Sequence, residues 1–263
     1  MFAEPATATA TAIKPARERG TKPRREALRH LLTPLVMAAV IGGLYFWVSA
    51  QSLDSIERRT LNADYIITSV SEHLKLTAMA VLLVVVIAIP LGVVLSRRAA
   101  RWVSPLVLGL ANLGQATPAI GLLVLLTIKF GVGFRIAVIG LVAYAVLPVL
   151  RNTIVGIQQV DPALVEAARG MGMTRAQVLF RVEMKMAIPV ILAGLRTALV
   201  MAVGVATLAT FVNAGGLGDI IVNGIKLNRT PVLLTGSVLT ACIAFLVDWI
   251  GSVAEDLLRP KGV

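Results

Sequence analysis

Few residues of this chain have the type and spacing that catalysis or metal binding requires. The chain has two histidines, His30 and His73, and one cysteine, Cys242, which lies inside an apolar run. The topology that the hydrophobic segments predict places the two histidines on opposite sides of a membrane. The sequence contains no G-x-x-x-x-G-K-[ST] phosphate-binding loop, and the glycines at 215–218 are typical of a turn. We therefore predict no metal site, no cofactor and no enzymatic activity.

Two ionisable residues lie within apolar segments. Arg196 is roughly 10 Å along its predicted helix from Pro189, at about 1.5 Å per residue, and Asp248 lies at a comparable depth in the last apolar segment. An unpaired charge inside a bilayer costs about 3 kcal/mol or more. We therefore predict an intramembrane ion pair between Arg196 and Asp248. The alternative is that each side chain extends separately to the membrane surface.

A cluster of polar residues and a proline interrupts another apolar segment. It consists of Asn112, Gln115, Thr117 and Pro118. Such an interruption is tolerated inside a membrane where it faces protein or a water-filled cavity. We predict that these residues line a path for a solute, and the alternative is a proline kink without further function.

A further apolar segment carries small residues at every fourth position. They are Gly194, Ala198, Ala202, Ala206 and Thr210. Small residues on one helix face let two helix backbones approach closely within a membrane. This face is predicted either to form a subunit interface or gate along the pathway, or to provide static helix packing inside one subunit.

The elements that must position these residues follow from the composition. The chain of 263 residues is 57% hydrophobic and 15% charged, whereas soluble domains average roughly 45–50% apolar and about 25% charged residues. Apolar runs that could span a bilayer as helices occur at about 35–50, 74–95, 103–128, 136–150, 189–212 and 232–252. We predict an all-α membrane protein, a polytopic six-helix bundle. Residues 1–34 are expected to form a disordered basic tail, and residues 35–50 the first transmembrane helix.

The net charge of +11 is explained by topology. Most of the 25 Lys and Arg residues lie in the amino-terminal tail, after the second and fourth spans, and at the carboxyl terminus. Segments rich in Lys and Arg stay in the cytosol, so both termini are predicted to be cytosolic. The basic excess therefore requires no nucleic-acid partner.

The longest polar stretch between spans, residues 151–188, falls on the predicted cytosolic side. Asp161 is a typical helix N-cap, with Pro162 in the first helical position. Glycines at 170–172 end this helix, and a capping box that starts at Thr174 begins another. The pattern predicts a helix–glycine–helix elbow. On these grounds alone, the elbow could also be a simple interfacial link between two spans.

The string EAARGMG at 166–172 resembles the EAA loop of bacterial ABC importer permeases. Further segments resemble the same family, closest to its osmoprotectant branch, the glycine betaine, carnitine and choline permeases: GQATPAIGLL (114–123), VLPVLRNT (146–153), PVILAGLRTA (189–198) and NAGGLGDIIVNG (213–224). The resemblance covers roughly residues 70–255 and implies a MetI-like ABC importer transmembrane domain. It departs at Met184-Lys185, where Leu-Pro is usual, and we predict that Pro189 takes over part of the helix-breaking role.

In this family a short helix of the loop docks into a groove on a cytosolic ABC ATPase. The resemblance implies that the coupling residues are Glu166, Ala167, Ala168 and Gly172. The two alanines would permit close approach of the ATPase. Glu166 would lie near the first turn of its helix, where the helix dipole favours an acid, and Gly172 would allow a sharp exit. ATP and Mg²⁺ would be bound by this partner.

The resemblance also implies the other partners and the substrate. The partners would be a second permease (the same chain or a sister permease), an extracytoplasmic solute-binding protein, and the lipid bilayer of the bacterial cytoplasmic (inner) membrane. The substrate would be glycine betaine, choline or carnitine, and the alternative is methionine, another amino acid or a sulfonate. From a different class, an ion-coupled secondary transporter would need membrane-buried acids, and the spans offer Asp248 near one end.

Overall fold

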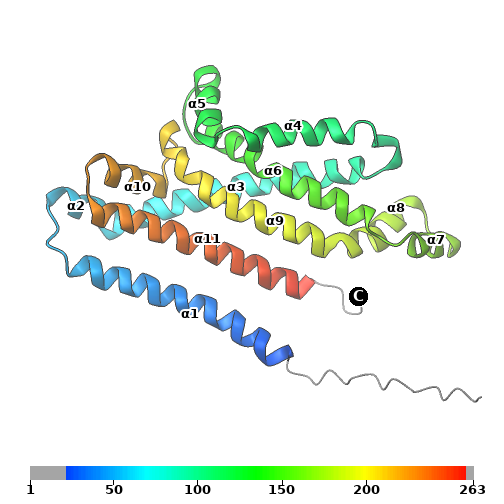
Figure 1. Ribbon diagram of the computed structural model, residues 1–263, viewed down its shortest axis with the longest axis horizontal. Coiled ribbons are helices and arrows are strands. Elements are labelled where there is room, and N and C mark those ends of the chain that lie inside the picture. Colours follow the sequence, from blue (N-terminus) through cyan, green and yellow to red (C-terminus); the bar gives the residue numbers. More distant parts are fainter. Residues whose placement is uncertain (1–21, 259–263) are drawn as a thin grey trace, which may run out of the picture.

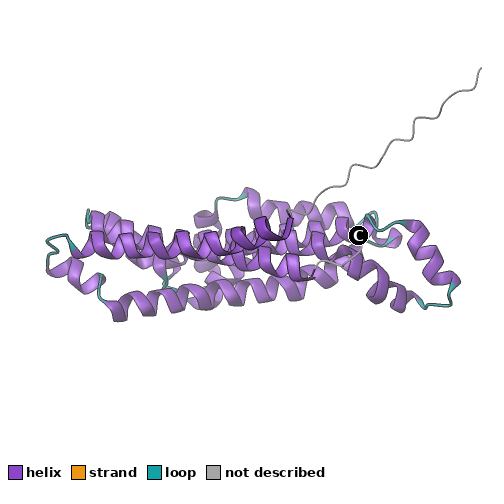
Figure 2. Cartoon of the chain, turned by 90° about the horizontal axis from the view of Figure 1, so that it is seen from below, coloured by secondary structure: helices purple, strands orange, loops and turns teal. Residues whose placement is uncertain are grey.

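The computed structural model describes residues 22–258, with side chains from residue 31 onward. Within this range every regular element is a helix (Figure 2). The long helices are α1 (Lys22–Ser49), α3 (Ala63–Leu95), α6 (Phe134–Gln158), α9 (Met184–Ala206) and α11 (Thr230–Leu258). The shorter ones are α2 (Ser55–Thr60), η1 (Arg98–Ala100), α4 (Ser104–Ala116), α5 (Ala119–Phe130), α7 (Pro162–Gly170), α8 (Arg175–Val178), η2 (Leu179–Glu183), η3 (Thr207–Val212) and α10 (Leu217–Lys226).

Five helical segments of the described chain are long and apolar enough to cross a membrane. They are Leu31–Ser49, Ala63–Leu95, Phe134–Gln158, Arg175–Val212 and Thr230–Leu258. The span predicted at 103–128 is a broken one, because α4 and α5 meet at an angle of 99°. Pro118 holds the preceding Thr117 in an extended conformation, with φ −75° and ψ 136°, which ends α4. The predicted all-α bundle of six helices is confirmed when α4 and α5 count as one broken span.

The predicted boundary of the amino-terminal tail is wrong. Because α1 begins at Lys22, residues 22–34 belong to a helix, while residues 1–21 of the predicted disordered tail lie outside the described range. The stretch rich in Ala, Thr and Pro ends near Pro23, and the segment 24–32 that follows consists mostly of good helix formers. Pro23 fits the first turn of a helix, where its missing N–H needs no partner.

Helix α6 lies at the centre of the bundle and packs against α3, α9, α4 and α5. Two clusters of buried apolar side chains fill the space between α3, α6 and α9; Val84, Val149 and Leu141 are fully buried there. Helix α11 covers α9 and α10, and α1 packs chiefly against α11. The core is therefore built mainly by the four helices α3, α6, α9 and α11, with α1 at the outside.

The face of small residues on α9 packs inside the chain. Its buried members are Gly194, Ala198, Ala202 and Ala206. A Cβ at Gly194 would lie 2.7 Å from both the Asn152 Cβ and the Pro148 carbonyl oxygen of α6. Thr210 leaves this register because the helix tightens into the 3₁₀ element η3. Static packing within one subunit is therefore the role that the structure supports for this face, and its buried members are not available to a subunit interface in this conformation.

The long helices run side by side between two ends of the molecule (Figure 1). The α7–α8 elbow, the start of α1 and the end of α11 lie at one end, and α2 and α10 lie at the other. The elbow and both ends of the described chain thus share one side.

Gly218 makes a close backbone contact at the end opposite the elbow. A Cβ at Gly218 would overlap the carbonyl oxygen of Thr207, and backbone cannot move aside easily. We expect Gly218→Ala to lower the free energy of unfolding by about 1–3 kcal/mol, measured by denaturation of the purified protein in detergent. Gly204→Ala is the matched control, because nothing lies within 4 Å of a Cβ there; alanine should stabilise that helix by about 0.5–1 kcal/mol. Equal stability of the two variants would contradict this account.

Candidate functional site

The segment between α6 and α9 forms the elbow that the sequence predicts. Asp161 caps α7 by accepting a backbone N–H at 2.8 Å, and Pro162 occupies the first helical position. Thr174 and Gln177 form the reciprocal capping box of α8. Both predicted helix starts are confirmed. The elbow itself begins later than the predicted residue 151, because α6 continues to Gln158.

Gly172 turns the chain between the two short helices. Its φ of +85° is a left-handed conformation that other residues adopt only with strain. Nothing lies within 4 Å of a Cβ built at this position. The glycine is therefore required for its backbone conformation, and it provides the sharp exit from α7 that the sequence predicts.

The residues of the EAA string do not all face outwards. Glu166 and Ala167 are exposed, but Ala168 is only 2% exposed and packs inside the elbow. The expectation that both alanines permit close approach of a partner is therefore wrong for Ala168, since successive helical residues point about 100° apart. Glu166, expected near the first turn of its helix, lies in the second turn, because α7 begins at Pro162.

An exposed apolar surface lies beside Glu166. Leu164, Ala167 and Met171 follow one another at helical spacing, and we call them the elbow face. Leu164 is 45% exposed and Met171 is 73% exposed. The small Ala167 lies between these two larger side chains along the helix and is exposed as well.

An ion pair connects the elbow with the transmembrane core. Arg97, just after the end of α3, donates hydrogen bonds at 3.2 and 2.6 Å to the two carboxylate oxygens of Glu183. Glu183 is 7% exposed and is the last residue of η2, a π-helical stretch that leads into α9. A bidentate pair fixes orientation as well as distance. This pair links the end of α3 to the segment that leads from the elbow into α9.

The helix that leaves the elbow continues through Pro189. This residue lies inside α9, which runs from Met184 to Ala206. The prediction that Pro189 takes over the role of the missing Leu-Pro as a helix breaker is therefore wrong. The irregularity lies earlier, in the π-helical turn at Leu179–Glu183, and such turns are frequent at functional sites.

The predicted intramembrane ion pair is present. The Arg196 guanidinium donates through both Nε and Nη2 to the two carboxylate oxygens of Asp248, the Nη2 bond being 2.6 Å long. The two side chains are 32% and 35% exposed. They border a cavity of about 470 Å³ together with Thr197 and Met201. The bidentate geometry excludes separate extension of the two side chains to the membrane surface in this conformation.

The polar residues around the α4–α5 bend do not converge on one site. The Gln115 amide points inwards and donates to the Tyr144 carbonyl oxygen of α6 at 3.0 Å. The Thr117 hydroxyl donates to a carbonyl of its own helix at 2.8 Å. Asn112 and Pro118 are exposed. The bend is thus more than a mild kink, and it directs Gln115 towards α6 and α9.

Residues 88–261 match the family described as the binding-protein-dependent transport system inner membrane component. The chain belongs to this family. The carnitine transport permease protein OpuCD of Listeria monocytogenes is 44% identical over 202 residues, which cover 76% of this chain and 89% of that protein. The glycine betaine/carnitine/choline transport system permease protein OpuCD of Bacillus subtilis is 39% identical over 200 residues (76% and 86%). The osmoprotectant import permease protein OsmW of Salmonella typhimurium is 38% identical over 216 residues (80% and 100%).

Solved structures share the fold. An inward-facing conformation of the MetNI methionine ABC transporter aligns with a TM-score of 0.66 at 24% identity, covering 74% of this chain and 96% of the other. An amino acid ABC transporter with histidines aligns with a TM-score of 0.64 at 20% identity (79% and 100%). The MetI-like transmembrane-domain fold implied by the sequence is therefore confirmed.

Family membership makes this chain the membrane-embedded permease component of a binding-protein-dependent transport system. Its role is transport. This family assignment disfavours the alternative of a secondary transporter that works alone, because its members are components of a transport system that includes a binding protein.

In this permease, two neighbouring residues of α3 that the sequence did not single out as a pair connect this helix to the glycine turn and to α9. Glu72 accepts a hydrogen bond from the Gly216 N–H at 3.0 Å, and the φ of +96° at Gly216 confirms the predicted turn. His73 is fully buried, with its Nε2 at 3.1 Å from the Val203 carbonyl oxygen. That carbonyl is available because the Thr207 N–H, four residues on, donates to the carbonyl oxygens of Gly204 and Val205, where α9 tightens into η3. The only sequence signal was two ionisable residues at the edge of an apolar run.

Proposed function

We propose that this chain is the permease subunit of an ATP-driven importer for osmoprotectants of the glycine betaine, carnitine and choline type. The observation that carries this proposal is the 44% identity to a carnitine permease over 76% of the chain. The choline transport system permease protein OpuBB of Bacillus subtilis, 40% identical over 192 residues, supports the same class. These solutes share a quaternary ammonium group, which defines the substrate class.

The elbow face is the docking surface for a cytosolic ABC ATPase in this proposal. Leu164, Ala167 and Met171 supply exposed apolar contacts, and the neighbouring Glu166 supplies a carboxylate for a basic residue of the partner. ATP and Mg²⁺ bind to that ATPase, because this sequence has no phosphate-binding loop. The Arg97–Glu183 pair then passes movements of the elbow to α3 and α9.

The elbow faces the cytosol, as do both termini, and the protein lies in the bacterial cytoplasmic (inner) membrane. The arrangement of the helices supports this orientation, because the elbow and both ends of the described chain lie at one end (Figure 1). The basic residues concentrated at that end support it as well, since Lys and Arg remain on the cytosolic side.

The solute path follows the side of α9 that faces away from the buried small residues. Gln115 reaches this side, with its amide nitrogen 3.6 Å from the Met201 sulfur. Thr197 and Met201 line the 470 Å³ cavity there. A second permease, either another copy of this chain or a sister, covers this open side and completes the path. An extracytoplasmic solute-binding protein delivers the solute and selects it.

Uptake by proteoliposomes tests this proposal. We expect labelled carnitine, choline or glycine betaine to accumulate only when the vesicles contain this permease, its ATPase and internal ATP, with the binding protein outside. The matched control replaces ATP by a non-hydrolysable analogue, which should reduce uptake to that of protein-free vesicles. Full uptake without an ATPase would contradict the ATP-driven mechanism. Uptake of methionine or a sulfonate alone would contradict the substrate class.

A further inference from the structure

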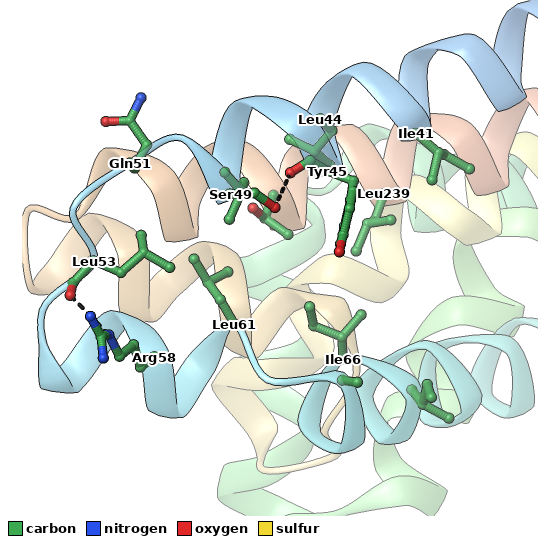
Figure 3. Close-up of a pocket in the computed structure, with 14 residues that line it drawn as sticks. Ile41, Leu44, Tyr45, Ser49, Gln51, Leu53, Arg58, Leu61, Ile66 and Leu239 are labelled. Atoms are coloured by element: carbon green, nitrogen blue, oxygen red, sulfur yellow. Dashed lines mark hydrogen bonds between the residues drawn. The ribbon is translucent and has the colours of Figure 1, made fainter.

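A cavity of about 580 Å³ lies between α1, α2, α3 and α11, at the end of the molecule opposite the elbow (Figure 3). We call it the α1 cavity. Its walls are mainly apolar and include Ile41, Leu44, Leu61, Ile66 and Leu239. Its size falls within the roughly 300–1,000 Å³ of ligand pockets. Most of its lining precedes residue 88, where the family match begins, so the cavity is not part of the matched transport core.

The α1 cavity exists because α1 is only loosely packed against the rest of the bundle. Only 6% of its apolar stretch, Leu31–Ser49, is buried, against 33% for Ala63–Leu95 and 44% for Phe134–Gln158. A second cavity of about 410 Å³ lies along the same contact between α1 and α11, lined by residues such as Val40 and Val238. A bound water needs two to four polar partners, and the apolar walls of these cavities offer few. Within a bilayer, the apolar molecules available to fill them are lipids.

The lining of the α1 cavity becomes more polar towards one end. Figure 3 shows Gln51 and Arg58 at that end, beside Leu53, and Ile41 and Leu239 at the other. Tyr45 lies between these ends, where its ring points away from α1 beside Leu239. This gradient matches an amphiphile, with its hydrocarbon chain at the apolar end and its head group at the polar end.

Arg58 is the charged side chain among the described residues that line the α1 cavity. Its Nε donates to the Leu53 carbonyl oxygen at 3.1 Å, which holds the exposed guanidinium at the cavity mouth. The neighbouring acids are engaged elsewhere: Asp54 pairs with Arg229 at 2.7 Å, and Glu57 accepts the Asp54 N–H at 2.9 Å. The positive charge of Arg58 is therefore directed to an anionic group from outside the chain.

We propose that the α1 cavity binds one membrane phospholipid, with an acyl chain between α1 and α11 and its phosphate at Arg58. A guanidinium matches a phosphate well, because it offers several N–H donors in one plane. The lipid fills the space that α1 leaves open and so holds this helix against α11. Under the proposed orientation, it belongs to the outer leaflet.

Native mass spectrometry of the full-length protein in detergent tests this site. The probes carry acyl chains and a phosphate, acyl chains alone, or a phosphate alone. We expect one phosphatidylglycerol molecule to be retained, diacylglycerol with the same chains to be retained several-fold less, and glycerol 3-phosphate not at all. Arg58→Gln should lower phosphatidylglycerol retention by roughly 10- to 100-fold, as expected for one hydrogen bond to a charged group. Arg59→Gln is the matched control, because Arg59 is also exposed but does not line the cavity; it should retain the lipid fully.

A second variant fills the cavity from its wall. Val48→Trp should displace the lipid while the helical circular dichroism stays unchanged. Equal losses for Arg58→Gln and Arg59→Gln, or equal retention of diacylglycerol and phosphatidylglycerol, would overturn the proposal. An altered oligomeric state of Val48→Trp with unchanged lipid retention would also overturn it, since a second protein chain would then occupy the space. Arg58 lies at the surface, so its variant remains informative even where Val48→Trp fails to fold.

Discussion

Glu166→Lys should abolish solute uptake by the reconstituted importer while the permease still inserts into the membrane. Glu166 is exposed on α7, so its replacement costs the fold little. At an interface with an ATPase, however, the reversed charge would face the basic group that the carboxylate normally meets. Juxtaposed like charges at an interface cost several kcal/mol, and about 3 kcal/mol already weakens binding by roughly 100-fold. The measurements are the affinity of the ATPase for the permease in detergent and uptake in proteoliposomes.

Gln159→Lys is the matched control for this effect. Gln159 is exposed just before the elbow, so lysine adds a positive charge nearby without removing the carboxylate of Glu166. We expect ATPase affinity within about threefold of that of the unaltered protein, because separated surface charges are screened by salt. Unchanged ATPase binding and unchanged uptake in Glu166→Lys would remove the coupling role from this residue. Equal losses in both variants would point to net charge and not to a specific contact.

Local signals in the sequence were enough to predict the elbow. The caps at Asp161 and Thr174 involve residues at most three positions away, so each helix start can be recognised without any tertiary contact. The left-handed conformation at Gly172 follows in the same way from the chain leaving a helix. The side of α7 that becomes buried could not be predicted. Ala167 and Ala168 are identical in type, and only the packing of α7 against the rest of the elbow decides that Ala168 is the buried one.

Most contacts between helices could not be predicted from the sequence. The buried Glu183 and its partner Arg97 come from distant segments and carry no local pattern. From the sequence, His73 could be assessed only as a metal ligand. In the structure it contacts the Val203 carbonyl oxygen of α9, which lies 130 residues away in the sequence. Pro189 illustrates the opposite error, since a proline can lie inside a membrane helix where its surroundings compensate for the missing hydrogen bond. The Arg196–Asp248 pair was the exception, because the cost of an isolated charge in a bilayer limits its choice of partner.

Arg196→Met should destabilise the permease by about 2–3 kcal/mol, because it leaves the Asp248 carboxylate without its bidentate partner inside the bundle. This value lies below the usual cost of about 3–5 kcal/mol for breaking a buried ion pair, since both side chains are about one third exposed. The measurement is the free energy of unfolding of the purified protein in mixed detergent micelles. Arg135→Met is the matched control: Arg135 is an exposed arginine at the start of α6, and its loss should change stability by less than about 0.5 kcal/mol.

The double variant with Asp248→Asn distinguishes the pair from two independent effects. If Arg196 stabilises the fold mainly through Asp248, removing both charges should cost less than the two single losses together, with a coupling free energy of about 1–3 kcal/mol. The charge exchange, Arg196→Asp with Asp248→Arg, should recover part of this coupling, because the two side chains face each other across α9 and α11. Additive losses would mean that the contact contributes nothing to stability. The pair also borders the proposed solute path. If the charge-exchange variant recovers stability but not uptake, these charges have a role in transport as well as in folding.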